Sequence, residues 1–199
     1  MHKYVFALFF IFAQKGYSSF SLPFHGVLSF ERYSVFGCIV NRGLRARDIK
    51  VMRSNWVHNL DLGLQLLPTS MTQMEVFRFE KRDEAYISNL AAADVIEYEG
   101  YVSTSYSGYC HDITGGEPNI FYVIKHSSGR NIVKYAHTDE SYDYKRECEI
   151  LLPRRSKFRI LGIDRSGRHP VVYMEEIVPD IKEQIRDLEF RELPQGFFE

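Results

Sequence analysis

Residues 142–158 read YDYKRECEILLPRRSKF and hold two glutamates, Glu147 and Glu149, directly ahead of an apolar run. The run CEILL is typical of a buried strand, and Pro153 ends it. Acidic residues in such a position are commonly the protected edge of a sheet. They could equally form the front of an active site, and the rest of the chain has to decide between these interpretations.

The composition is that of a soluble globular protein with one domain. The chain has 199 residues, of which 45% are hydrophobic and 26% are charged, both in the normal range. Aromatic residues make up 15% of the chain, which favours a β-rich interior. The net charge of −1 gives no support for nucleic acid as a partner.

The cysteines and histidines form no metal-binding pattern, because neither CxxC nor HExxH occurs. We therefore expect no metal. Among the three cysteines, Cys38 and Cys110 are the most plausible disulfide pair in a secreted form. The spacing does not establish that they pair.

The chain begins with the layout of a secretory signal peptide. His2 and Lys3 precede an apolar run from Tyr4 to Ala13, which is too short to span a bilayer. We expect residues 1–20 to be a signal peptide, and the mature protein to be secreted without stable membrane insertion. A buried N-terminal strand or helix is the alternative.

Residues 21–70 have helical character, whereas short strands dominate afterwards. Leucines at helical spacing predict a helix after Ser54 that ends at Pro68, and the basic stretch 41–50 is expected to be solvated. We predict strands at 74–79, 97–105, 120–126, 129–136 and 148–152, a hairpin of 157–165 with 169–177, and helices at 82–93 and 180–190. The connections are too short for repeated βαβ crossovers, which indicates an α+β fold with mostly antiparallel sheets.

Three polar clusters occur in a fixed order at strand edges: Arg78 in VFRF, the triplet Ser103, Thr104 and Ser105, and the Glu147–Glu149 pair. Each is weak evidence when taken alone. Together they resemble the Arg–Ser–Glu class of mono-ADP-ribosyltransferases over roughly residues 74–177. GYVSTS is similar to the family's aromatic-x-Ser-Thr-Ser strand, and ECEILLPRRSKFRI is similar to its Glu-x-Glu strand.

The resemblance implies an ADP-ribosyltransferase fold, with two small packed sheets forming an NAD cleft and helices before them. Residues 21–70 would be the helical segment, residues 71–199 the catalytic core, and NAD the co-substrate. Arg78 would hold the NAD phosphates, and Ser103 would support the nicotinamide ribose and orient Glu149, the catalytic carboxylate. Thr104 and Ser105 would complete the cofactor-binding set by holding that strand.

The resemblance also implies an arginine acceptor, because family members with glutamate at the position of Glu147 modify arginine. On a continuous strand, Glu147 and Glu149 would share one face and Cys148 the other. Tyr142 or Tyr144 would recognise the acceptor, or would simply pack on their own domain. Residues 106–119 occupy the place of the family's phosphate–nicotinamide loop. Phe79 stands where many members have glycine, so a narrower phosphate pocket is expected.

The expected activity is transfer of ADP-ribose from NAD to an arginine of a target protein by a secreted toxin or effector. A delivery subunit, chaperone or immunity protein would be its further partner. An NAD glycohydrolase and a non-catalytic binding module of the same fold are the alternatives.

Overall fold

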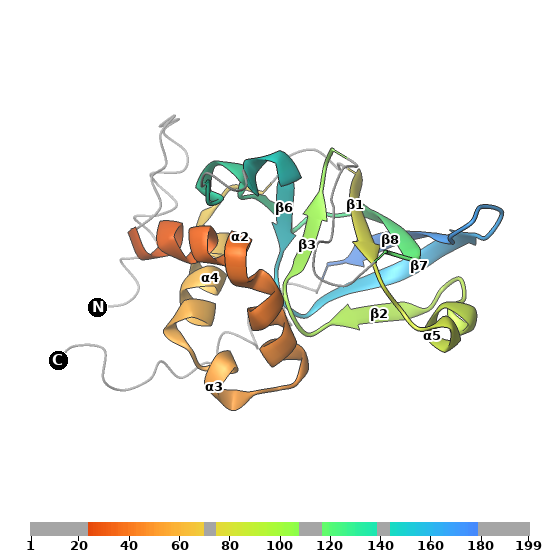
Figure 1. Ribbon diagram of the computed structural model, residues 1–199, viewed down its shortest axis with the longest axis horizontal. Coiled ribbons are helices and arrows are strands. Elements are labelled where there is room, and N and C mark those ends of the chain that lie inside the picture. Colours follow the sequence, from red (N-terminus) through yellow and green to blue (C-terminus); the bar gives the residue numbers. More distant parts are fainter. Residues whose placement is uncertain (1–23, 70–74, 108–116, 139–143, 179–199) are drawn as a thin grey trace.

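The computed structural model describes residues 24–69, 75–107, 117–138 and 144–178. Within these ranges, three helices come first, and the strands follow with one more short helix and two 3₁₀-helices among them (Figure 1). The helices are α2 Phe24–Arg45, α3 Ile49–Met52, α4 Asn55–Leu66, α5 Glu84–Asn89, η1 Val133–Tyr135 and η2 Tyr144–Glu147. The strands are β1 Glu75–Glu80, β2 Val95–Tyr98, β3 Val102–Ser105, β4 Ile120–Lys125, β5 Arg130–Asn131, β6 Glu149–Leu152, β7 Ser156–Asp164 and β8 Val171–Ile177.

The strands form one continuous ladder in the order β2-β7-β8-β4-β1-β3-β6-β5. Neighbouring strands run antiparallel except β4 and β8, which run parallel. β1 and β3 share a single residue pair, Phe77 with Ser105. The two sheets expected from the sequence are therefore the two parts of one ladder, joined at this pair. The predicted α+β class is confirmed.

Helix α4 begins and ends where the sequence predicts. The Ser54 side chain accepts a hydrogen bond from the backbone N–H of Val57, at 3.3 Å, and so caps the helix. The helix stops before Pro68, and its buried face includes Leu60 and Leu64. Asp83 caps α5 in the same way through the N–H of Tyr86.

Two hydrophobic cores lie on the two faces of β6. Leu151 belongs to the core that β6 shares with the helices, together with Phe30 and Leu60. Ile150 and Leu152 belong to the second core, whose buried residues all come from strands. Figure 1 shows α2 and α4 beside β6 and β3. The helices therefore cover the part of the ladder that carries the serine and glutamate clusters.

Two predicted strands differ from the observed ones. Residues 129–136 form only the short β5, because the Asn131 side chain accepts a hydrogen bond from the N–H of Val133 and turns the chain into η1. Residues 97–105 are divided between β2 and β3. The break is at Gly100, where a Cβ atom would lie 2.6 Å from Oδ1 of Asn41, so a larger residue would displace the Asn41 side chain.

The predicted hairpin is confirmed, and two other predictions fall outside the described residues. The hairpin of β7 and β8 is antiparallel as expected. The predicted signal peptide 1–20 and the predicted helix 180–190 lie outside the described residues. Within the described ranges, no helix combines the length and the apolar character that a membrane span requires.

Candidate active site

Three neighbouring strands bring the predicted clusters together. β1, β3 and β6 are adjacent in the ladder, where Phe77 pairs with Ser105 and Ser105 pairs with Glu149. Arg78 is the next residue along β1. An arginine, a serine triplet and a glutamate that are far apart in the sequence therefore meet on adjacent strands.

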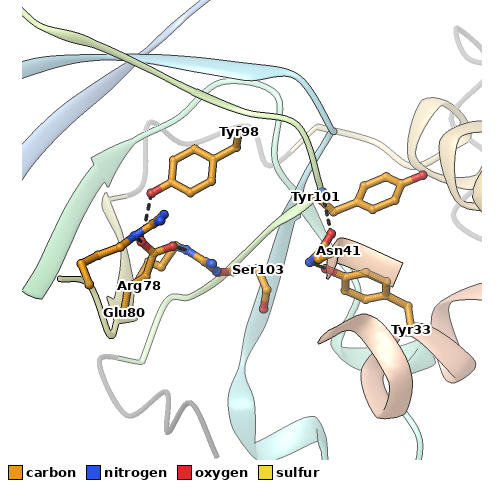
Figure 2. Close-up of polar contacts among 8 residues, drawn as sticks. Tyr33, Asn41, Arg78, Glu80, Tyr98, Tyr101 and Ser103 are labelled. Atoms are coloured by element: carbon orange, nitrogen blue, oxygen red, sulfur yellow. Dashed lines mark hydrogen bonds and ion pairs between the residues drawn. The ribbon is translucent and has the colours of Figure 1, made fainter. Parts of the chain in front are cut away.

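Arg78 is held by two hydrogen bonds and an aromatic ring. Its Nη1 group donates to the backbone oxygen of Ser103 at 2.6 Å, and its Nε group donates to Oε1 of Glu80 at 2.6 Å. The guanidinium carbon lies 5.6 Å from the centre of the Tyr98 ring, and Figure 2 shows this group beside Ser103. Burial alone would lower the pKa of Arg78, but the charge of Glu80, the hydrogen bond to it and the nearby tyrosines together outweigh burial and raise the pKa.

Two more arginines lie near Arg78, and the sequence analysis did not single them out. Nε of Arg82 donates to Oε2 of Glu80 at 2.7 Å. Arg45, at the end of α2, is close enough that burial and then the positive charge of Arg78 lower its pKa. In the part of the chain that the structure describes, Arg45 has no ion-pair partner. Two guanidinium groups thus bond one carboxylate, and a third lies close enough to be influenced by its charge. Such an excess of positive charge suits a bound anion.

Glu149 is a buried carboxylate with a strongly raised pKa. Its side chain is 4% exposed. Burial raises its pKa to about 7, helped by the charge of Glu147 and opposed by a hydrogen bond from the Ser103 hydroxyl and by the charge of Arg78. A carboxylate that changes its ionisation near neutral pH, and that a hydroxyl holds in place, is typical of a functional site.

The expectation that Glu147 lies on the same strand as Glu149 is wrong. β6 begins at Glu149, and Glu147 is the last residue of η2. Cys148 between them has a φ of 52°, in the left-handed region, so strand alternation does not extend across it. Cys148 is half-buried there, and its backbone oxygen accepts from the N–H of Tyr106 at 3.2 Å. Glu147 is nevertheless close enough for its charge to raise the pKa of Glu149.

The other members of the serine triplet bond within the protein. The Thr104 hydroxyl donates to the backbone oxygen of Ile150 at 2.7 Å and so ties β3 to β6. The Ser105 hydroxyl pairs with the hydroxyl of Ser107 at 3.0 Å and accepts from its backbone N–H at 3.1 Å. These contacts hold the strand that presents Ser103.

Helix α2 contributes an unforeseen support for this strand. Oδ1 of Asn41 accepts from the backbone N–H of Tyr101 at 2.9 Å, and Nδ2 of Asn41 donates to the Tyr33 hydroxyl at 2.9 Å (Figure 2). Burial and the negative charge of Glu149 raise the pKa of Tyr33. The basic stretch 41–50 was expected to be solvated, but it includes the buried Asn41. This asparagine anchors α2 to Tyr101, which is two residues before Ser103. Its only sequence signal is its place between the apolar residues Val40 and Leu44.

The remaining candidates have simpler surroundings. The Tyr144 ring lies 6.3 Å from the ring of His137, whereas Tyr142 lies outside the described residues. Phe79 packs against Phe121, with ring centres 5.0 Å apart. It alternates with Arg78 along β1 and so faces the other side of the strand. The narrower pocket expected from Phe79 therefore has no basis.

Three further predictions concern a possible disulfide, the phosphate–nicotinamide loop and metal binding. Cys38 is an exposed free thiol, and Cys110 lies outside the described residues. Most of the predicted phosphate–nicotinamide loop, residues 108–116, lies outside them too. The described ranges contain no group of three or more His, Cys, Asp or Glu residues placed to hold a metal ion.

Comparison with solved structures identifies the fold. The ADP-ribosyltransferase Vis in complex with agmatine superposes with a TM-score of 0.63 at 19% identity, covering 89% of this chain and 86% of Vis. The C3 exoenzyme of Clostridium limosum superposes with a TM-score of 0.60 at 14% identity, covering 84% of this chain and 92% of the exoenzyme. HopU1 of Pseudomonas syringae, also an ADP-ribosyltransferase, gives a TM-score of 0.55 at 19% identity, covering 70% and 64%.

Sequence comparison adds nothing to this, because no protein-family model and no curated protein matches the chain. The likeness is therefore one of structure, and it spans the helices as well as the sheet. The chain has the fold of the bacterial ADP-ribosyltransferase toxins.

Proposed function

We propose that this protein is a mono-ADP-ribosyltransferase that cleaves NAD between nicotinamide and ribose and transfers ADP-ribose to an arginine of a target protein. The observation that carries the proposal is the convergence of Arg78, Ser103 and the buried Glu149 on three adjacent strands. The fold, which is that of ADP-ribosyltransferases, supports the same reaction.

The arginines around Glu80 would bind the diphosphate of NAD. Arg78, Arg82 and Arg45 supply three positive charges against one carboxylate. A guanidinium binds phosphate oxygens in a fork and stays charged at every physiological pH. The excess positive charge favours a dianionic ligand at this place.

Glu149 would act at the ribose. When the bond between C1′ and the nicotinamide nitrogen breaks, nicotinamide leaves with the electron pair and positive charge develops on the ribose. A carboxylate bonded to the ribose 2′-hydroxyl stabilises that charge more in the transition state than in the ground state. The hydrogen bond from Ser103 keeps Glu149 oriented for this role. Thr104 and Ser105 would support the strand from which Ser103 acts.

Glu147 would receive the acceptor. A target guanidinium is a poor nucleophile while it is protonated, and a carboxylate can pair with it, align it and take its proton as a nitrogen bonds to C1′. Glu147 is close enough to Glu149 to influence its pKa, so both carboxylates can serve one reaction centre. Agmatine, the ligand in the Vis structure, is itself a guanidine compound, and it supports an acceptor of this chemistry. Tyr142 or Tyr144 would contact the target protein.

The biological setting that we propose is a secreted toxin or effector with a signal peptide at residues 1–20. The neighbours include a toxin from Paenibacillus larvae and a type III effector from Xanthomonas. Their roles are consistent with action on a target cell, with a delivery subunit, chaperone or immunity protein as a further partner.

The test is incubation of the purified chain with biotinylated NAD and a eukaryotic or bacterial lysate, followed by mapping of the modified residues. We expect labelled protein, release of the label by hydroxylamine, and competition by agmatine. Glu149→Gln should abolish labelling while NAD binding persists. Nicotinamide release that is independent of any acceptor would indicate an NAD glycohydrolase. NAD binding without turnover would indicate a binding module.

A further inference from the structure

Glu80 is a buried carboxylate that holds two of the arginines. It ends β1, lies on the same face as Arg78 because side chains alternate along a strand, and is 5% exposed. Its Oε1 atom accepts from Nε of Arg78 at 2.6 Å, and its Oε2 atom accepts from Nε of Arg82 at 2.7 Å. Tyr98 adds a longer hydroxyl contact of 3.5 Å to Oε2. One carboxylate thus sets the positions of two guanidinium groups.

Both arginines meet Glu80 through Nε, which leaves their terminal nitrogens for other partners. A guanidinium is a rigid plane with five N–H donors, so fixing two of its edges fixes the direction of the rest. In Arg78 the second fixed edge is Nη1, which donates to the backbone oxygen of Ser103. The contacts with Glu80 and Ser103 leave the Nη2 group of Arg78 in a defined orientation.

The electrostatics suit Glu80 to fixing the two arginines in place rather than to transferring a proton. Burial would raise the pKa of Glu80, but the charges of Arg78 and then Arg82 outweigh burial and lower it. The carboxylate therefore stays ionised at neutral pH. Removing it would leave two guanidinium groups without their counter-charge, which is costly in a buried place.

We propose that Glu80 is a positioning residue that fixes the guanidinium groups of Arg78 and Arg82 as a preformed receptor for the diphosphate of NAD. The inference rests on the proposed function, since it takes NAD as the anion. A preformed pair of arginines loses less rotamer freedom when the ligand binds, so affinity is higher than for two mobile side chains. A plain charge-balancing role would affect folding stability but not NAD affinity in the folded protein.

The experiment compares three variants of the full chain: Glu80→Gln, Glu80→Asp and Glu75→Gln. NAD dissociation constants are measured by calorimetry in a Glu149→Gln background that prevents turnover, and KM and kcat for nicotinamide release are measured with Glu149 intact. Glu80→Gln should raise Kd and KM by about ten- to a hundredfold, with a much smaller change in kcat. Glu75, exposed at the start of the same strand, is the matched control, and its variant should bind like wild type.

Glu80→Asp separates geometry from charge. It keeps the buried negative charge but is one methylene shorter, so it cannot bridge the two Nε groups that Glu80 bridges. We expect Kd to rise by about tenfold, while Tm stays closer to wild type than for Glu80→Gln. If Glu80→Gln does not fold, the aspartate variant alone decides.

Each outcome has a defined meaning. A lower Tm with unchanged Kd in the Glu80 variants overturns the positioning role and leaves charge balance. Failure of the wild-type chain to bind NAD overturns the proposed function, and this inference with it. That failure is visible before any Glu80 variant is made, so the two failures are distinguishable.

Discussion

The guanidinium of Arg78 is hydrogen-bonded to the backbone oxygen of Ser103, at 2.6 Å, so the strand that carries the serine triplet is tied directly to the arginine strand. The Ser103 hydroxyl in turn donates to Glu149. One residue thus links the group proposed to bind phosphate with the group proposed to act at the ribose. A substitution of Arg78 or of Glu149 should therefore also change the position of Ser103.

Replacing Arg78 with lysine should weaken NAD binding while the positive charge is kept. Arg78 donates to Glu80 through Nε and to Ser103 through Nη1, which leaves Nη2 for a phosphate. A single ammonium group cannot make all three contacts at once. We expect KM for NAD to rise by about ten- to a hundredfold, as measured by nicotinamide release. Arg159→Lys, on the exposed side of β7, is the control. An Arg78→Lys enzyme with wild-type KM would show that charge alone is sufficient.

The pH dependence of turnover should follow the ionisation of Glu149. Its pKa in the free protein is raised to about 7, first by burial, and the carboxylate must be ionised to stabilise positive charge on the ribose. Because kcat/KM reports the free enzyme, we expect kcat/KM to fall as the pH is lowered through about 7. Nicotinamide release measured between acidic and mildly alkaline pH tests this. A profile that stays flat across neutral pH would assign the ionisation to another group.

The same raised pKa makes Glu149 a cost to stability at higher pH. The folded protein holds the Glu149 proton up to about pH 7, whereas the unfolded chain releases it near the ordinary value of 4.5. The stability that the protonated Glu149 side chain contributes is therefore fully present below pH 4.5 and is lost as the pH rises through about 7. We expect Glu149→Gln to be more stable than wild type at pH 8 by on the order of 1–3 kcal/mol, with little difference at pH 4.

Urea unfolding of both proteins at the two pH values measures this difference. Glu75→Gln, at an exposed position of β1, serves as the control and should show no such pH-dependent gain. An equal stability difference at both pH values would mean that the carboxylate's charge is not the cause.

The fold could be read from the sequence because its main signals are local or ordered along the chain. Ser54 and Pro68 mark the ends of α4, and the alternation in β7 and β8 marks the hairpin. Strand alternation would also have placed Glu80 beside Arg78, since FRFE puts both on one face. The predicted strand 74–79 stops one residue before Glu80, whereas β1 includes it.

What the sequence could not indicate are contacts between distant segments and local backbone twists. Asn41 binds Tyr101 across sixty positions of the chain, and no periodicity carries that information. The left-handed backbone of Cys148 is a non-glycine exception, so the strand expected to continue back to Glu147 begins only at Glu149. The order of the three clusters predicted their convergence, but not the arginines that join them.

Asn41→Ala should destabilise the junction between α2 and β3. It leaves the buried N–H of Tyr101 without its acceptor and the Tyr33 hydroxyl without its donor. We expect a loss of about 1–3 kcal/mol in the free energy of unfolding, measured by urea denaturation. Asn89→Ala, at the exposed end of α5, should cost far less. Similar losses at both positions would argue that the Asn41 contacts contribute little.

Glu147→Gln should separate cleavage of NAD from transfer to arginine. Glu147 sits at the end of η2 rather than on β6, yet it is close enough to raise the pKa of Glu149. The amide cannot take a proton from the acceptor guanidinium, but bond breaking at the ribose depends on Glu149. We expect ADP-ribosylation of agmatine to fall by about 10²–10⁴-fold, while nicotinamide release into water falls much less. Lys145→Gln, on the same 3₁₀-helix, controls for a general disturbance of η2. If both activities of Glu147→Gln fall together, Glu147 serves cleavage as well, and its role as a selective acceptor base is wrong.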